Sequence, residues 1–172
     1  GAGGHKLLIG RVMELGKEAK ADNVTGLRRE VRLRLDMEEL LRDRPEAIRY
    51  VMRVGIDNFK EINEKESIEA GDNVLRELAG CIMQTVNKNV DVYRLMADEF
   101  MIVDAHSRTE QDAWAIYEEI KKRVAQTVRE KEYSFFYTIS AGVMEDGFAG
   151  KSAQDILRLT EFALNEAKRA GR

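Results

Sequence analysis

Two adjacent carboxylates, Asp98 and Glu99, are the residues of this chain best suited to carry chemistry. They follow Met96–Ala97 and precede the apolar run Met101–Val103, a pattern that predicts a tight turn leading into a buried strand. Neighbouring acids beside a buried strand are costly to hold unless they bind a cation or face water. The pair therefore predicts a cation site or a solvent-facing site at the end of a sheet.

A second polar segment lies upstream, where residues 54–72 read V-G-I-D-N-F-K-E-I-N-E-K-E-S-I-E-A-G-D. From spacing alone, Asn63 is interpreted as a cap at the end of a short helix. Asp72 is interpreted as the N-cap of the long helix that follows, because Gly71–Asp72 comes just before its apolar stripe. Both side chains also have the chemistry to read guanine, since a carboxylate accepts from N1–H and the 2-amino group and an amide donates to O6.

Together the two segments resemble the GGDEF family, the diguanylate cyclase domains that join two GTP molecules into cyclic di-GMP. The upstream segment is similar to the family pattern D-(I/L)-D-x-F-K-x-I-N-D-x-x-G-H-x-x-G-D. Residues 94–100, R-L-M-A-D-E-F, are similar to R-x-G-G-(D/E)-E-F. Two flanking segments add to the resemblance: D-N-V-T-G-L at residues 22–27 resembles D-x-L-T-G-L, and A-L-N-E-A-K-R-A-G-R at residues 163–172 resembles A-L-Y-x-A-K-x-x-G-R.

The resemblance implies a catalytic site in which paired carboxylates hold Mg²⁺ or Mn²⁺ on the triphosphate of GTP. Asp98 matches the metal-binding acid of the second motif, with Glu99 as its catalytic neighbour, and the backbone of Ile56 matches a further metal contact. The first acid of the strand motif is replaced by Gly55, which offers no side-chain ligand. Asp57 is an alternative ligand, because a two-residue offset places it on the same face of the strand as Gly55.

The resemblance also implies nucleotide contacts. It assigns base recognition to Asn63 and Asp72. It assigns the other nucleotide contacts to Asn58, Phe59, Lys60, Lys168 and Arg172, with the three basic side chains on phosphates. The R-x-x-D motif of product inhibition is absent, because Asn87 and Val90 occupy its positions. Feedback binding of cyclic di-GMP at that place is therefore not expected.

Hydrophobic periodicity predicts the elements that must position these residues. Helices are expected over residues 6–21, 28–42, 58–64, 71–86, 109–130 and 152–170, and strands over 47–56, 91–95, 99–105 and 135–144. Met96–Ala97 is expected at the tip of a hairpin, where a glycine would favour the positive φ that such turns need. The order predicts an α+β fold with helices on one central sheet that contains antiparallel pairs. The resemblance implies the palm-like, ferredoxin-related fold of nucleotidyl cyclases.

Bulk properties set the domain count and exclude some partners. A length of 172 residues, 44% hydrophobic and 34% charged, suits one domain plus a short extension. We assign residues 1–21 to the extension, with a helix that either ends a signalling stalk or packs on its own domain, and residues 22–172 to the GGDEF-like domain. A net charge of −3 gives no case for nucleic acid, and no apolar run is long enough to span a membrane. The resemblance implies a cytoplasmic location, either free or as part of a membrane-anchored receptor.

The substitutions Gly55, Met96 and Ala97 fall on the chemistry of the site, so the sequence predicts a degenerate GGDEF domain with impaired cyclase activity. Its role would be to bind GTP or to act as a regulatory or dimerisation module, as a homodimer or fused to sensor or phosphodiesterase domains. One alternative is an active cyclase that holds its metals with Asp57, Asp98 and Glu99. The other is a protein-interaction scaffold that binds neither nucleotide nor cofactor.

Overall fold

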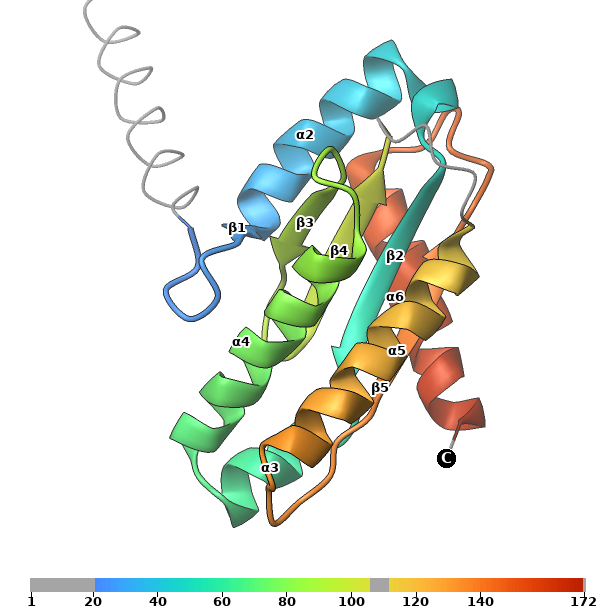
Figure 1. Ribbon diagram of the computed structural model, residues 1–172. Coiled ribbons are helices and arrows are strands. Elements are labelled where there is room, and N and C mark those ends of the chain that lie inside the picture. The colour runs from blue at the N-terminus through green and yellow to red at the C-terminus, as the bar shows by residue number, and fades with distance from the viewer. Residues whose placement is uncertain (1–20, 106–111, 172) are drawn as a thin grey trace, which may run out of the picture.

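The computed structural model describes residues 21–105 and 112–171, and its strands form one mixed sheet (Figure 1). In the sheet order β1-β3-β4-β2-β5, the strands are β1 (Arg28–Arg29), β3 (Asp91–Arg94), β4 (Glu99–Asp104), β2 (Tyr50–Ile56) and β5 (Ile139–Met144). β2 pairs antiparallel with both β4 and β5, while β1 runs parallel to β3. Because β2 is an interior strand with neighbours on both sides and helices on both faces of the sheet, all seven of its residues are buried.

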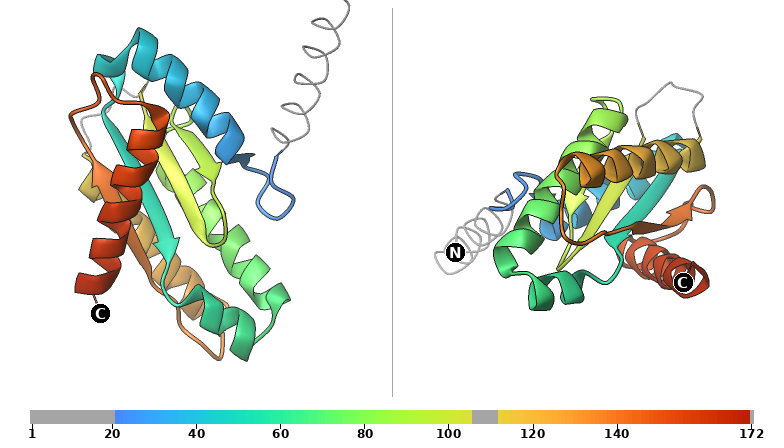
Figure 2. Two further views of the ribbon diagram at one scale, coloured as in Figure 1. Left: turned by 180° about the vertical axis from the view of Figure 1, so that it is seen from behind. Right: turned by 60° about the horizontal axis from the view of Figure 1, so that its bottom comes forward.

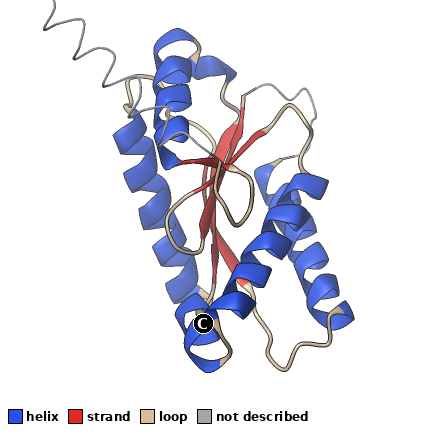
Figure 3. Cartoon of the chain, turned by 90° about the vertical axis from the view of Figure 1, so that its left-hand side faces the viewer, coloured by secondary structure: helices blue, strands red, loops and turns tan. Residues whose placement is uncertain are grey.

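Helices cover both faces of the sheet, as the edge-on view in Figure 3 shows. The helices are α2 (Glu30–Asp43), α3 (Phe59–Lys65), α4 (Ile68–Thr85), α5 (Ala113–Glu130) and α6 (Ala153–Ala170), with a 3-10 turn η1 at Pro45–Ala47. α4 and α5 lie on one face, and α2 and α6 on the other (Figures 1 and 2). The predicted α+β class is confirmed, and β2 to β5 have the strand order of a ferredoxin-like sheet.

Alternation along β2 divides the core between the two faces. Met52 and Val54 are fully buried in the cluster formed with α4 and α5, whereas Val51 is fully buried in the cluster formed with α2 and α6. Each such side chain contributes roughly 1.5–3 kcal/mol when it leaves water. The two clusters hold the sheet rigidly between the helices that carry the candidate site.

The long helix α4 begins earlier than the sequence predicts. The hydroxyl of Ser67 accepts a 2.9 Å hydrogen bond from the Ala70 N–H and so caps a helix that starts at Ile68. Asp72 therefore lies inside α4, and its interpretation as the N-cap is wrong. Asn63 likewise lies within α3 rather than at its end. The predicted N-cap at Ser152 is confirmed, as part of a capping box with Asp155.

Two predicted strands begin too early. Residues 47–49 and 135–138 stay outside the sheet, so that β2 begins at Tyr50 and β5 at Ile139. β1 is missed by the sequence because two arginines give no alternating pattern, and α2 therefore begins at Glu30 rather than at residue 28. The helix predicted over residues 6–21 falls, except for its last residue, outside the described residues.

β5 and α6 meet at Gly142 with their backbones in contact. A Cβ atom at this position would lie 2.7 Å from the carbonyl oxygen of Thr160 and 2.8 Å from the carbonyl carbon of Ala163. Only glycine allows this approach, which sets the depth at which α6 packs on the sheet. No helix in the described ranges is long and apolar enough to cross a membrane.

Candidate nucleotide site

The site is built around the turn between β3 and β4. The Leu95 N–H donates to the Glu99 carbonyl at 2.8 Å and closes the turn, and Ala97 has a φ of 60°, as the sequence predicts for its tip. The side chain of Met96 is exposed. Arg94 holds the turn from the side, since its guanidinium donates to the Ala97 carbonyl at 2.6 Å and to the Asp22 carboxylate at 2.8 Å.

Asp98 points from the turn toward the end of β2. Its carboxylate accepts a 3.1 Å hydrogen bond from the Ile56 N–H, and one of its oxygens lies 3.7 Å from Nζ of Lys168 on α6. Burial raises the pKa of the Asp98 carboxyl above its ordinary value, and this effect outweighs the opposite effect of the Lys168 charge. The structure thus brings together Asp98, the Ile56 backbone and Lys168, three of the predicted site groups.

Gly55 lies opposite Glu99 in the antiparallel ladder of β2 and β4. A Cβ atom built on Gly55 would lie 3.1 Å from Lys168 Nζ and 3.2 Å from Leu164 Cδ2. Side chains from α6 therefore border the position that a carboxylate side chain at residue 55 would occupy. A substitution at residue 55 would require the lysine to shift.

Glu99 is engaged by a residue that the sequence interpretation missed. Nε of Arg53 donates a 2.6 Å hydrogen bond to Glu99 Oε1, and its NH1 donates to the Leu157 carbonyl on α6 at 3.0 Å. The available signal was a single arginine in an otherwise apolar strand, two residues before Gly55 and therefore on the same face.

Asp57 is hydrogen-bonded to the start of β5 and to the residue just before that strand. Its two carboxylate oxygens accept hydrogen bonds from the hydroxyls of Thr138 at 2.7 Å and Ser140 at 2.8 Å. Within the described residues, no group of three or more His, Cys, Asp or Glu side chains is placed to hold a metal ion. Asp57, Asp98 and Glu99 therefore do not form a three-acid cluster, and the carboxylates of Asp57 and Glu99 are each hydrogen-bonded to other side chains.

The predicted base-reading residues lie on α3 and α4, which pack against each other. The Asn63 side-chain oxygen lies directly against Gly71, in the space that a Cβ atom of residue 71 would occupy. Asp72 follows Gly71 in α4, and both Asn63 and Asp72 are half-buried. The glycine thus lets the Asn63 amide on α3 approach the backbone of α4, one residue before Asp72.

The remaining predicted contacts surround the start of α3. Asn58 has a left-handed φ of 57° at the N-cap position, and the half-buried ring of Phe59 packs against the core cluster of α4 and α5. Lys60 is exposed, with its ammonium 3.8 Å from Glu64. Arg172 lies outside the described residues.

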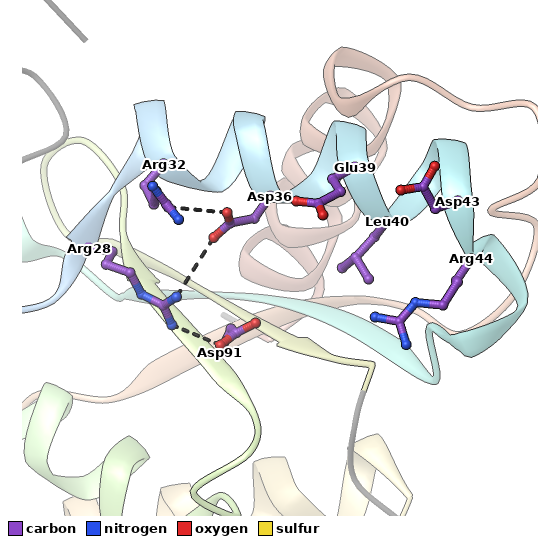
Figure 4. Close-up of a pocket in the computed structure, with 8 residues that line it drawn as sticks. All are labelled: Arg28, Arg32, Asp36, Glu39, Leu40, Asp43, Arg44 and Asp91. Carbon is purple, nitrogen blue, oxygen red and sulfur yellow. Dashed lines mark hydrogen bonds and ion pairs between the residues drawn. The ribbon is translucent and has the colours of Figure 1, made fainter. Parts of the chain in front are cut away.

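A second polar pocket lies between α2 and β3 (Figure 4). Arg28 donates to Asp91 at 2.9 Å and lies 3.7 Å from Asp36, which also pairs with Arg32 at 3.1 Å. These opposite charges compensate one another and join the start of α2 to β3. We interpret the cluster as structural.

Comparison with known sequences gives a consistent result. A family model described as "Diguanylate cyclase, GGDEF domain" matches residues 19–172. Diguanylate cyclase A of Treponema denticola is 33% identical over 129 residues, which cover 71% of this chain and 33% of that protein. A diguanylate cyclase of Vibrio cholerae is 32% identical over 119 residues, covering 69% and 36%. The chain thus spans about a third of the length of these curated relatives.

Solved structures agree with the sequence matches. Diguanylate cyclase SiaD of Pseudomonas aeruginosa, solved in complex with its activator SiaC, has a TM-score of 0.77 at 26% identity, covering 99% of this chain and 66% of that one. A sensory box/GGDEF family protein of Caulobacter crescentus has a TM-score of 0.73 at 27% identity, covering 88% and 99%.

Proposed function

The chain belongs to the GGDEF family of diguanylate cyclase domains, and from this membership we propose that it is a regulatory module of cyclic di-GMP signalling that binds GTP but cyclises it poorly. In this proposal Asn63 and Asp72 read the guanine base. Lys60, Lys168, Arg172 and the backbone at Asn58 and Phe59 receive the phosphates.

The observation that carries the proposal is the contact of Asn63 with Gly71, next to Asp72. An amide packed against α4 and a carboxylate on the next residue of that helix would supply the donor and the acceptors that the edge of guanine requires. The contact fixes the amide before any ligand arrives, so that less side-chain freedom is lost on binding.

The proposed poor cyclisation follows from the residues around Asp98, where the family binds its metal ions. Family chemistry uses Mg²⁺ or Mn²⁺ to neutralise the triphosphate, and a cation supplies several kcal/mol of charge stabilisation to such a reaction. Here Gly55 offers no ligand, and Glu99 is paired with Arg53. The exposed side chain of Met96 also stands at the turn where glycine would let the backbone approach a phosphate.

A second candidate is an active cyclase of unusual sequence. Two relatives above 30% identity are named diguanylate cyclases, and the chain retains Asp98 and Glu99. In this case Asp57 would have to leave Thr138 and Ser140 and turn toward Asp98, with Mg²⁺ or Mn²⁺ bound between them.

Calorimetric titration with GTP, with and without Mg²⁺, tests the proposal when product is assayed in the same samples. We expect saturable binding without cyclic di-GMP, weakened at least tenfold, about 1.4 kcal/mol, by Asn63→Ala and by Asp72→Ala. The matched control Asn73→Ala, at an exposed neighbouring position of α4, is expected to bind normally. Product from the native chain would favour the second candidate, and absence of binding would favour a protein-interaction scaffold.

A gain-of-function variant separates the causes of poor cyclisation. Gly55→Asp combined with Met96→Gly and Ala97→Gly restores the family residues at all three positions. Turnover of GTP by this variant but not by the native chain would assign the loss to these substitutions. If neither protein turns over GTP, the loss lies elsewhere in the site.

The proposed partners follow from the short span of the match. Because the chain covers about a third of its first relatives, we propose that it works within a longer cytoplasmic protein, as a homodimer or fused to a sensor or phosphodiesterase domain. Residues 1–21 would then form the connecting stalk, which stays a prediction. Cross-linking of the full-length protein with and without GTP tests whether the nucleotide changes its oligomeric state.

A further inference from the structure

The ammonium of Lys168 lies beside the position from which a carboxylate side chain at residue 55 would extend. Its Nζ and Cε atoms lie 3.1 and 3.2 Å from the Cβ position of Gly55. Such a separation is tighter than ordinary van der Waals contact, so that any side chain at residue 55 displaces the lysine. The glycine therefore leaves Lys168 room that a side chain at residue 55 would reduce by a few tenths of an ångström or more.

The same ammonium faces Asp98 in a sheltered place. Nζ lies 3.7 Å from Asp98 Oδ2, and the two side chains are only 20% and 15% exposed. Charges shielded from water to this degree attract each other more strongly than a surface pair does. Asp98 Oδ2 also accepts the Ile56 N–H at 3.1 Å. The acid is thus compensated by groups of its own chain.

A divalent cation finds few ligands in this arrangement. Mg²⁺ requires oxygen ligands at about 2.0–2.1 Å in near-octahedral geometry, usually with one or two carboxylates. Glu99 is held by Arg53, Asp57 is bonded to two hydroxyls, and residue 55 has no side chain. An incoming cation at Asp98 would also meet the positive charge of Lys168.

We propose that the ammonium group of Lys168 takes the place of a divalent metal ion in this site, where it lies against Gly55 and pairs with Asp98. The inference deepens the proposed function and rests on it only in treating Asp98 as the remnant of a cation site. It predicts a pocket that receives phosphate through an ammonium group and needs no Mg²⁺. The absence of a side chain at Gly55 favours this position of Lys168, so that the two residues are expected to be coupled.

The test uses Mn²⁺ alone, without nucleotide, so that its outcome is independent of whether GTP binds. By calorimetry we expect no saturable Mn²⁺ binding to the native chain below the millimolar range. The double variant Gly55→Asp/Lys168→Met is expected to bind Mn²⁺ at least tenfold more tightly, and Lys168→Met alone to show a smaller gain. Native binding as tight as that of the double variant would overturn the proposal.

Lys151→Met is the matched control. It removes the same charge from an exposed position near the opposite end of α6, roughly 25 Å away at 1.5 Å per residue, and should leave Mn²⁺ binding unchanged. An equal gain in this variant would show that net charge alone explains the effect, which would contradict the proposal.

A second measurement needs no variant and therefore does not depend on how the substitutions fold. Paramagnetic broadening by Mn²⁺ is followed on the Ile56 amide of the native chain, whose N–H donates to Asp98. We expect this amide to broaden no more than amides far from the site. Selective broadening of the Ile56 amide would place a metal ion at Asp98 and overturn the proposal.

Discussion

The guanidinium of Arg53 donates a 2.6 Å hydrogen bond to the carboxylate of Glu99, so that the second acid of the M-A-D-E-F segment is bound to its own sheet. The same guanidinium donates to the Leu157 carbonyl and thereby joins β2, β4 and α6. Since the Arg53 side chain is 11% exposed, this link belongs to the interior of the domain rather than to its surface.

Replacing Arg53 should destabilise the fold. Arg53→Met keeps much of the apolar stem but leaves Glu99 without its partner. We expect a loss of about 2 kcal/mol in the free energy of unfolding, below the 3–5 kcal/mol of fully buried pairs because Glu99 retains some contact with water. Urea denaturation measures the loss. In a double-mutant cycle with Glu99→Gln the two losses should be non-additive, and strict additivity would contradict the pairing.

Substitution by alanine should change the stability of the fold in opposite directions at Gly142 and at Gly80. Gly142→Ala forces a methyl group into the α6 backbone and should cost at least about 2 kcal/mol of stability. Gly80→Ala, in α4 where nothing lies within 4 Å of the new methyl group, should gain about 0.5–1 kcal/mol from helix propensity. Thermal unfolding of both variants checks the contrast, and a stabilising Gly142→Ala would disprove the close approach.

Ala97→Gly should stabilise the domain slightly. The left-handed φ of 60° strains an alanine but not a glycine, and relief of that strain is expected to exceed the added chain entropy by up to about 1 kcal/mol. The control Ala125→Gly, at an exposed position in the middle of α5, should instead cost about 1 kcal/mol. Chemical denaturation of the pair measures both effects, and equal losses would speak against the strained turn.

The contribution of Asp22 to stability should depend on pH. Burial acts to raise the pKa of this carboxyl, but hydrogen bonds from Thr25 and Arg94 outweigh burial and lower the pKa below its ordinary value of 3.8. A lowered pKa in the folded state gives stability that is present above pH 3.8 and is lost as the pH falls through the folded-state value.

The free energy of unfolding of the native protein should therefore exceed that of the Asp22→Asn variant by about 1.5 kcal/mol at neutral pH. The difference should shrink below pH 3.8. Melting curves of both proteins across the acidic range measure this difference. A gap that stays constant with pH would contradict the assigned pairing with Arg94.

The elements with strong periodicity were predictable. α5 and α6 carry clear apolar stripes, and the hairpin of β3 and β4 follows from two short apolar runs on either side of Met96–Ala97. β1 was not predictable, because its two residues join the sheet through tertiary pairing with β3 rather than through any pattern of their own. Residues 135–138 read as a strand because they are aromatic, yet the side chain of Phe136 is exposed.

The sequence motifs identified the acidic residues of the candidate site. They did not identify the basic side chains that pair with these acids. The motifs locate Asp98, Asn63 and Asp72 along the chain, but pairing across strands decides that Glu99 meets Arg53. In the same way, the place of Lys168 depends on how closely α6 approaches the sheet, which Gly142 sets by contacts remote in sequence.

Arg94 connects two loops of the domain that are remote in sequence. Its guanidinium donates hydrogen bonds to the Asp22 carboxylate, at the start of the described chain, and to the carbonyl of Ala97 at the tip of the hairpin. These two loops are more than seventy residues apart in sequence, yet both are hydrogen-bonded to the same side chain. Displacing either loop would therefore strain its hydrogen bond to Arg94. We therefore expect a displacement of the hairpin tip to be transmitted to the segment at Asp22.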